Sequence, residues 1–311
     1  MQKIFNFIFE RSWILEVSLR RFFEVIKPIK NIALKIFDNN KHKNQSKPVV
    51  QGQWENFKKC INNLDIQSGE IVLVHSSIKG LATLGVSANQ IIDYLLERVG
   101  NEGTLVFPAY PDYELMKNGR INPYYDYRVS KPWTGKLPRT FLEYPEVERS
   151  LFPHNTLAAK GPLAKEMMKG NLQSVYSQGK NSAWDFCVQN NMKILYLGVQ
   201  ACTSCTIVHY PEDILAEDWP VNNWFEEENY DIWVDGKIIQ KKIMTRRKFW
   251  FKFYKMFNTG YWMRKKGFLE EYDIDGVYIG FMSNSKGLCD ELIKRAKDGK
   301  LLFAIPKKYR K

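Results

Sequence analysis

The sequence predicts an α/β fold: one layered domain with a central mixed β-sheet flanked by helices, behind an N-terminal amphipathic helical extension. Short apolar runs alternate with stretches of helical periodicity between residues 49 and 311. Strands that alternate with helices are typical of a layered α/β domain. The chain has 311 residues, of which 44% are hydrophobic and 26% are charged, as is usual for a folded soluble protein.

The extension covers residues 1–48 and carries one apolar stripe at helical spacing, flanked by arginines and lysines. The stripe consists of Leu15, Leu19, Phe22, Ile26, Ile29, Ala33 and Ile36. Pro28 is expected to end or kink the first helix, because its ring clashes with the preceding turn. The helix lies either on a membrane or partner chain or on the protein's own core, and both interpretations stay open. Residues 39–48 are predicted to be a polar linker.

The elements of the domain follow from local patterns in residues 49–311. Apolar residues at helical spacing predict two helices, at residues 54–64 and 88–99. Ser87 is the expected N-cap of the second helix, and Gly100 its stop. Short apolar runs predict three buried strands, one after a turn within residues 68–77, one within residues 103–111 and one at residues 192–199.

The net charge of +12 comes from two segments. Residues 1–48 carry a net +6 and residues 241–266 a net +10, which leaves a mildly acidic remainder. A nucleic-acid-binding protein more often spreads its basic residues over a folded face. We therefore expect no nucleic-acid partner, and an anionic membrane surface or an anionic small molecule instead. The second segment reads as a basic aromatic insertion at about 238–267.

Cysteine usage and the N-terminus predict the compartment. The five cysteines are scattered and odd in number, and no secretory leader is recognisable, so we expect reduced thiols in a cytoplasm. No uncharged run reaches the roughly twenty residues that span a bilayer. The predicted location is cytoplasmic, with peripheral attachment to the inner face of the membrane and a homo-oligomer as open options.

Each predicted strand ends in a polar or Gly/Pro cluster. The clusters are His75-Ser76-Ser77 for the first strand, residues 108–112 for the second, and residues 198–206 for the third. Ligands of open α/β sheets bind in crevices outside the strand ends. We therefore expect these three clusters to form one site.

The stretch CTSCTIVHYPED, residues 202–213, has two interpretations. Cys202, Cys205 and His209 resemble part of a zinc site, but no second Cys/His pair completes it, so no metal is expected. If a helix begins at Thr206, that residue is its cap, and His209 and Glu212 share a face. A carboxylate in that position can support an imidazole as a general base. Taken alone, the pair is better explained as an ordinary surface pair.

The order of motifs resembles the antibiotic N-acetyltransferase family, founded on the aminoglycoside 3-N-acetyltransferases. The segments that carry the resemblance are GEIVLVHSSIKGLATLG, IIDYLLERVGNEGTLVFPAYP, WTGKLPRTFLEYPEVERSLFPHNTLAAKGPLA, QGKNSAWDF and ILYLGVQACTSCTIVHYPED. The match covers residues 54–215 and, weakly, 267–306. Five ordered motifs are far more specific than any one of them.

The resemblance implies a CoA-dependent N-acyltransferase with acetyl-CoA or another acyl-CoA as donor. The family's Thr-x-x-His-x-x-Glu falls on Thr206, His209 and Glu212, and Asp112 matches an acid after the second strand. His75, Ser76 and Ser77, with Thr206, are the residues expected to hold the coenzyme. Tyr110 and Arg149 are expected to contact the acceptor. Trp250, in the basic aromatic segment outside the match, is expected to do so as well, because an aromatic face can stack on a sugar.

One position departs from the family pattern. The aminoglycoside enzymes read Arg-Ser-x-His-Pro, whereas this chain reads RSLFP, with Phe152 in place of the histidine. His154 follows two residues later, and in an extended chain residues two apart face the same side. His154 therefore either replaces the missing imidazole or is an ordinary loop histidine.

These observations lead to one expected function and two alternatives. The expected function is acyl transfer to the amine of an amino sugar, namely a nucleotide- or lipid-linked precursor of a surface polysaccharide. The alternatives are an aminoglycoside 3-N-acetyltransferase that confers resistance, and a non-catalytic membrane-associated scaffold. In the enzyme, His209, His154 or both are the base, and donors near Ser76, Ser77 or Thr206 stabilise the oxyanion.

Overall fold

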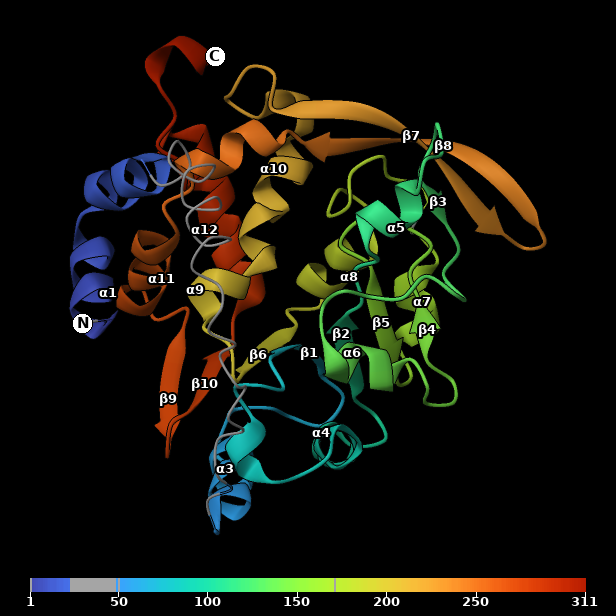
Figure 1. Cartoon of the computed structure of the whole chain (residues 1–311), viewed down its shortest axis with the longest axis vertical. Helices are drawn as coiled ribbons and strands as arrows, with labels where there is room; N and C mark the ends of the chain where they lie inside the picture. Colours follow the sequence, from blue (N-terminus) through green and yellow to red (C-terminus); the bar gives the residue numbers. More distant parts are fainter. Residues whose placement is uncertain (1, 23–48, 50, 171) are drawn as a thin grey trace, which may run out of the picture.

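The computed structural model describes residues 2–22, 49, 51–170 and 172–311. Its centre is a seven-stranded sheet in the order β4-β5-β2-β1-β6-β10-β9 (Figure 1). The strands are β1 (Ile71–Ser76), β2 (Thr104–Pro108), β4 (Glu148–Arg149), β5 (Leu157–Lys160), β6 (Lys193–Leu197), β9 (Glu270–Ile274) and β10 (Val277–Met282). Strands β2, β1 and β6 are parallel, and β5 and β10 join them antiparallel. The predicted mixed sheet and its three buried strands are confirmed.

Helices cover both faces of this sheet, because successive side chains of each central strand point to opposite sides. On β1, Val72 and Val74 face one apolar core, while Ile71 and Leu73 face the other. The first core lies under α3 (Gln53–Asn62), α4 (Ala88–Val99) and α6 (Lys136–Phe141). The second lies under α7 (Ala164–Met168), α8 (Ala183–Gln189), α10 (Tyr210–Leu215) and α12 (Ser285–Lys297).

Helix α4 shows how local sequence sets an element. Ser87 accepts a hydrogen bond from the Gln90 backbone N–H, and the Gln90 side chain accepts one from the Ser87 N–H. This reciprocal capping box satisfies two amides that a helix start otherwise leaves unpaired. The helix ends at Gly100, which adopts a positive φ. The cap and the stop predicted from the sequence are both confirmed.

A long hairpin lies outside the main sheet and projects away from it (Figure 1). Strands β7 (Phe225–Val234) and β8 (Lys237–Arg246) pair antiparallel, and β3 (Tyr124–Tyr125) pairs with β7. Asp235 and Gly236 form its two-residue turn with positive φ angles of 46° and 87°, as such a tight turn requires. Residues at the end of β8, among them Arg246, line a cavity of the candidate site.

The basic aromatic segment at 238–267 is spread over three elements: β8, η4 (Lys248–Phe253) and α11 (Met256–Lys265). Its aromatic residues Trp250 and Phe253 are buried in a third apolar core with Trp219, Trp224 and Phe303. The shorter helices are α5 (Tyr113–Lys117), α9 (Ala201–Ser204), η1 (Ala82–Leu84), η2 (Thr206–His209), η3 (Ala216–Asp218) and η5 (Lys307–Tyr309). Trp250, which the sequence offers as a ligand contact, therefore packs inside the protein, whereas Phe249 and Phe251 of the same segment are exposed.

The described part of the extension packs on the protein itself. Helix α1 (Gln2–Arg11) lies beside α11 (Figure 1), and residues 13–22 are also helical. Glu16 is buried and accepts hydrogen bonds from the backbone N–H groups of Phe257 and Asn258 in the first turn of α11. Pro28 and the linker at 39–48 lie outside the described residues. None of the described helices has the length and hydropathy to cross a bilayer.

Candidate active site

Two cavities meet at His209. The first, of about 290 Å³, is lined by residues at or just after the ends of β1, β2 and β6, and we call it the strand-end cavity. The second, of about 710 Å³, lies at the base of the β7–β8 hairpin, and we call it the hairpin cavity. His209 lines both. The imidazole of His209 can therefore contact a molecule bound in either cavity.

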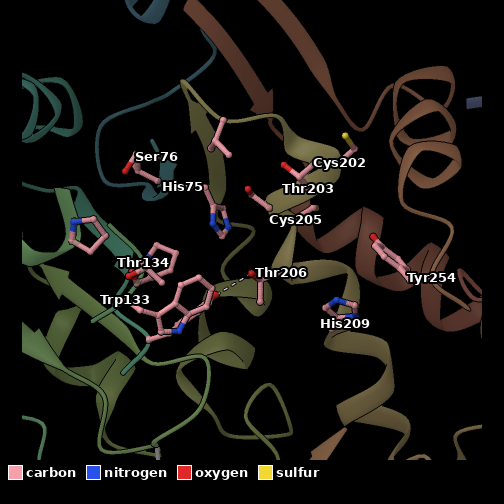
Figure 2. Close-up of a pocket in the computed structure, with 16 residues that line it drawn as sticks. His75, Ser76, Trp133, Thr134, Cys202, Thr203, Cys205, Thr206, His209 and Tyr254 are labelled. Atoms are coloured by element: carbon pink, nitrogen blue, oxygen red, sulfur yellow. Dashed lines mark hydrogen bonds between the residues drawn. The ribbon is translucent and has the colours of Figure 1, made fainter. Parts of the chain in front are cut away.

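The strand-end cavity joins the three polar clusters predicted to converge. Figure 2 shows His75 and Ser76 on one side and Cys205, Thr206 and His209 on the other. The loops after β1 and β6 touch closely: a Cβ built on Gly80 would lie 1.9 Å from the carbonyl oxygen of Gly198. Only glycine allows this approach. The contact fixes the two loops, and hence the two walls, relative to one another.

His75 is a buried wall residue with an unused polar atom. Its ring stacks on Tyr196 at 5.1 Å between centroids, and its Nε2 has no hydrogen-bond partner within the described residues. Burial lowers the pKa of His75 to about 3, so the ring is neutral. Ser76 also lines the cavity, whereas Ser77 does not: its hydroxyl accepts from the Gly80 N–H. His75 and Ser76 thus fit the expected coenzyme contact better than Ser77.

His209 and Glu212 form the pair expected from their spacing. Nδ1 of His209 lies 2.8 Å from Oε1 of Glu212. The predicted helix cap at Thr206 is wrong, because residues 206–209 form the 3₁₀ turn η2 and α10 begins only at Tyr210. The Thr206 hydroxyl instead accepts a hydrogen bond from Tyr110 at 3.0 Å. The pair forms through the turn that precedes the helix.

Glu212 is held from three directions. It is 1% exposed. Besides His209, its carboxylate accepts from Nε1 of Trp224 at 3.0 Å and lies 3.2 Å from Nη1 of Arg246. Buried carboxylates are tolerated only when paired and hydrogen-bonded in this way. Its position is therefore fixed independently of any ligand.

The surroundings of His209 favour its neutral form. Burial lowers its pKa, the Arg246 cation lowers it further, and the Glu212 carboxylate opposes both. With its Nδ1 proton directed at Glu212, the ring presents the lone pair of Nε2. A neutral imidazole with a free nitrogen is the form that accepts a proton from an amine.

We expect a pH dependence that follows from this shift. At saturating substrate, kcat should stay constant as the pH falls from 8 to 7 and decline only below about 6.5, the ordinary pKa of histidine. A lowered pKa keeps the base free of its proton down to a lower pH. The substrate must be saturating because Asp213, which lines the hairpin cavity, also changes its charge in this range: burial raises its pKa to about 7. At saturation, a change in substrate binding caused by Asp213 does not alter the measured kcat. A decline centred above pH 7 would contradict His209 as the base.

Thr206 and Tyr110 supply a hydroxyl donor on the same side of the strand-end cavity as His209. Both line the strand-end cavity, and burial raises the pKa of Tyr110, which keeps its hydroxyl protonated. Because Tyr110 donates to the Thr206 oxygen, the Thr206 proton remains free to donate into the cavity. That arrangement suits a developing oxyanion.

Replacing Thr206 with valine is expected to lower kcat by about 10²-fold with little change in KM, since a donor that acts on the oxyanion matters only in the transition state. Tyr110→Phe should show a smaller loss, because it frees the orientation of Thr206 without removing its hydroxyl. Steady-state kinetics of both variants measure this. Equal or larger loss in Tyr110→Phe would show that the tyrosine itself is the donor.

His154 lines the hairpin cavity together with His209. Its Nε2 contacts the Tyr230 hydroxyl, which donates to Glu228 at 3.0 Å, and burial lowers its pKa to about 4. Phe152, where the family has histidine, is buried in an apolar cluster with Tyr125 and Tyr230. His154 therefore shares the cavity with His209, and its role stays a prediction.

Three predicted site residues have other positions. Asp112 is the N-cap of α5 and accepts from the Glu114 and Leu115 amides. Arg149 is buried and donates to three backbone carbonyls, those of Tyr127, Ser130 and Ala109. Trp250 is 2% exposed and stacks on Trp224. None of the three lines either cavity. Their side chains are instead used to cap a helix, to bind buried carbonyls and to stack in an apolar core.

The sequence did not indicate that Arg246 and Trp224 bind Glu212. Arg246 stood out only as one cation among ten in its segment. The Asp-Gly pair between two strand-like runs was the available signal, since it predicts a hairpin. A hairpin places the end of its second strand, where Arg246 lies, beside the start of its first strand. The same hairpin brings Glu226 and Glu228 to the cavity.

The cysteines near the site act as packed side chains. The Cys205 thiol interacts with the Tyr196 hydroxyl at 3.0 Å, and burial raises the pKa of Cys205 to about 11 and that of Cys202 to about 12. In the part of the chain that the structure describes, no three His, Cys, Asp or Glu side chains are grouped to hold a metal ion.

Comparisons with known proteins identify the family. A family model described as aminoglycoside 3-N-acetyltransferase matches residues 73–278. Aminoglycoside N(3)-acetyltransferase III of Serratia marcescens is 30% identical over 173 residues, which make up 51% of this chain and 64% of that protein. The chain thus spans somewhat less than two thirds of the length of this relative.

Solved structures share the fold. A variant of aminoglycoside acetyltransferase AAC(3)-IVa in complex with a gentamicin matches with a TM-score of 0.65 and 20% identity, over 86% of this chain and 95% of that one. AAC-IIIb in its binary complex with CoASH matches with a TM-score of 0.66 and 18% identity, over 82% and 98%.

The prediction of a nucleotide- or lipid-linked polysaccharide precursor as acceptor is wrong, since the relatives are aminoglycoside acetyltransferases and favour the stated alternative. It depended on the basic aromatic segment. Much of that segment packs inside the fold: Trp250 is buried and Arg246 is paired with Glu212. The chain belongs to the aminoglycoside 3-N-acetyltransferase family.

Proposed function

We propose that this protein transfers an acetyl group from acetyl-CoA to an amino group of an aminoglycoside. The observation that carries the proposal is the His209–Glu212 pair at the junction of two cavities. Such a junction suits a base that acts between a thioester in one cavity and an amine in the other. The CoASH complex of AAC-IIIb and the gentamicin complex of AAC(3)-IVa support the two substrates by kinship.

The reaction proceeds by direct transfer. Nε2 of His209 takes a proton from the substrate ammonium, and the freed nitrogen lone pair attacks the thioester carbonyl. The Thr206 hydroxyl donates to the oxygen of the tetrahedral intermediate. As the C–S bond breaks, the sulfur leaves with the bonding electron pair and takes a proton from the His209 imidazolium. The ring, neutral again, accepts the second proton of the new amide nitrogen and passes it to solvent, so that the reaction releases one proton overall. Glu212 stabilises that imidazolium while it exists.

The donor fits the strand-end cavity. His75 and Ser76 present polar atoms there, and Nε2 of His75 has no partner among the described residues. A buried polar atom without a partner is costly, and a polar group of a bound ligand removes that cost. We assign these two residues to the thioester arm of the coenzyme.

The acceptor fits the hairpin cavity. Four acids line it, namely Glu114, Asp213, Glu226 and Glu228, together with three cations, Arg246, Arg247 and Lys248. Arg246 is already paired with Glu212. Carboxylates around a cavity favour a ligand with several ammonium groups, which suits an aminoglycoside.

Purified full-length protein with acetyl-CoA and gentamicin tests this function. We expect release of free thiol that depends on the aminoglycoside, and a product one acetyl group heavier by mass spectrometry. A panel of other aminoglycosides defines the acceptor range. No acceptor-dependent thiol release with any of them would refute the proposal, and release without acceptor would indicate a thioesterase.

We also propose that the outer face of residues 7–22 rests on an anionic membrane surface. The inner face is occupied by α11, to which Glu16 and Glu10 bind. The outer face exposes large apolar side chains: Phe7, Ile8, Trp13, Ile14, Leu15, Leu19 and Phe22. The basic Arg11 and Arg21 are exposed beside them. Apolar residues flanked by cations suit the interface of anionic lipids.

Vesicle sedimentation checks the membrane proposal. The protein should sediment with vesicles rich in phosphatidylglycerol and much less with phosphatidylcholine. The double variant Ile14→Asp, Leu15→Asp should lose most of the binding, while Ile121→Asp, at a 93% exposed position elsewhere, should not. Equal binding by both variants refutes it, as does a homo-oligomer in solution that Ile14→Asp, Leu15→Asp dissociates.

A further inference from the structure

Arg246 reaches the His209–Glu212 pair from a distant part of the chain. It is the last residue of β8 and lies opposite Phe225 of β7 in the register of the hairpin. Its Nη1 contacts Nδ1 of His209 and lies 3.4 Å from Oε1 and 3.2 Å from Oε2 of Glu212. Its side chain is 14% exposed and lies over the ring of Phe251 at 4.8 Å.

Two neighbours therefore compete for one ring atom. Nδ1 of a neutral imidazole either donates to Glu212 or accepts from Arg246, and it cannot do both. Donation to Glu212 leaves Nε2 as the base, whereas acceptance from Arg246 places the proton on Nε2 and blocks it. Each of these bonds has one ionised partner, so both are charge-assisted. The guanidinium of Arg246 can direct its protons to the Glu212 carboxylate, an acceptor of opposite charge, and then has no need of the ring nitrogen. With the proton on Nδ1, the ring donates to Oε1 of Glu212, and all three groups are satisfied together.

We propose that Arg246 is a positioning residue that, through Glu212, holds His209 as a neutral ring with Nε2 free. It anchors Oε2 of Glu212 so that Oε1 stays directed at His209. The positive charge of Arg246 also repels the charge of a protonated His209 ring. The ring is therefore neutral when the substrate ammonium arrives. This role rests on the proposed function, since it concerns the base of that reaction.

The other groups around His209 do not supply this effect. Tyr254 and Phe303 face the ring at 5.6 and 6.2 Å between centroids and carry no charge near neutral pH; burial raises the pKa of Tyr254. Thr206 and Cys205, on the same turn, are uncharged, and burial raises the pKa of the thiol to about 11. Asp213 adjoins Glu212 and is hydrogen-bonded to Ser177 and Gln178. Arg246 is the cation that lowers the pKa of His209.

NMR of the imidazole rings tests this without any substrate. The chain has four histidines, so the His209 signals are assigned by their loss in His209→Gln. In the wild type, we expect nitrogen shifts typical of a protonated Nδ1 and a titration below pH 6.5. Arg246→Gln should raise the pKa of His209, and Arg246→Lys, which keeps the charge, should restore most of the wild-type titration. Lys242→Gln removes an exposed cation from the same strand and should change nothing.

The kinetic counterpart is a pH profile of kcat. In Arg246→Gln, the loss relative to wild type should be at least about tenfold greater at pH 6 than at pH 8.5, because the raised pKa protonates the base at the lower pH. An unchanged His209 titration and tautomer in Arg246→Gln, or an equal loss at both pH values, would overturn the proposal. If the wild type acetylates no aminoglycoside, the proposed function fails while the titration still decides the role of Arg246.

Discussion

Replacing His209 with glutamine is expected to lower kcat for acetyl transfer by about 10²–10⁴-fold, the usual contribution of a general base. Glutamine keeps the approximate volume and the hydrogen bond to Glu212 but cannot accept the proton of an ammonium at neutral pH. KM for acetyl-CoA should change little, because the base does not bind the coenzyme. Steady-state kinetics with a fixed aminoglycoside and varied acetyl-CoA give both numbers.

His154→Gln is the matched comparison. His154 lines the hairpin cavity with His209 but is bound to Tyr230 rather than to a carboxylate. We therefore expect its main effect on KM for the acceptor. If His154→Gln lowers kcat more than His209→Gln does, the base is His154, and it has replaced the family histidine that is absent at Phe152.

Replacing Glu212 with leucine is expected to reduce both stability and activity. The change leaves the guanidinium of Arg246 and the Trp224 N–H without their partner. Removing one member of a buried ion pair costs about 3–5 kcal/mol. We expect the lower end of that range, because Arg246 lines the hairpin cavity and its charge can be hydrated there. Denaturant unfolding monitored by circular dichroism gives the free energy of unfolding. The activity should fall as well, since the ring of His209 loses the group that orients it.

The double variant Glu212→Leu, Arg246→Met separates the two effects. It removes both charges at once, which leaves no uncompensated buried cation. Most of the lost stability should return, less the cost of the unpaired Trp224 N–H, while the activity should stay low. A single variant as stable as the wild type would show that Glu212 and Arg246 are not a buried pair in solution.

The sequence predicted those features whose cause lies within a few residues. The buried strand that contains His75, the cap at Ser87 and the stop at Gly100 were all correct. So was the neighbourhood of His209 and Glu212, since three residues along a turn bring side chains together. The misplaced helix start at Thr206 shows the limit: a 3₁₀ turn and an α-helix bring the two residues together equally, but they give the preceding hydroxyl different partners.

The sequence alone determined that strands and helices alternate, that polar clusters follow the strands, and that an imidazole lies beside a carboxylate. Tertiary structure decided which distant residues complete the site. Arg246 lies 37 residues from His209 in the chain, and only the folding of the hairpin brings it to the ring. It also decided that Arg149 and Trp250 serve the fold. The reason is physical: burial and partners set the role of a polar side chain, and both exist only after long-range packing.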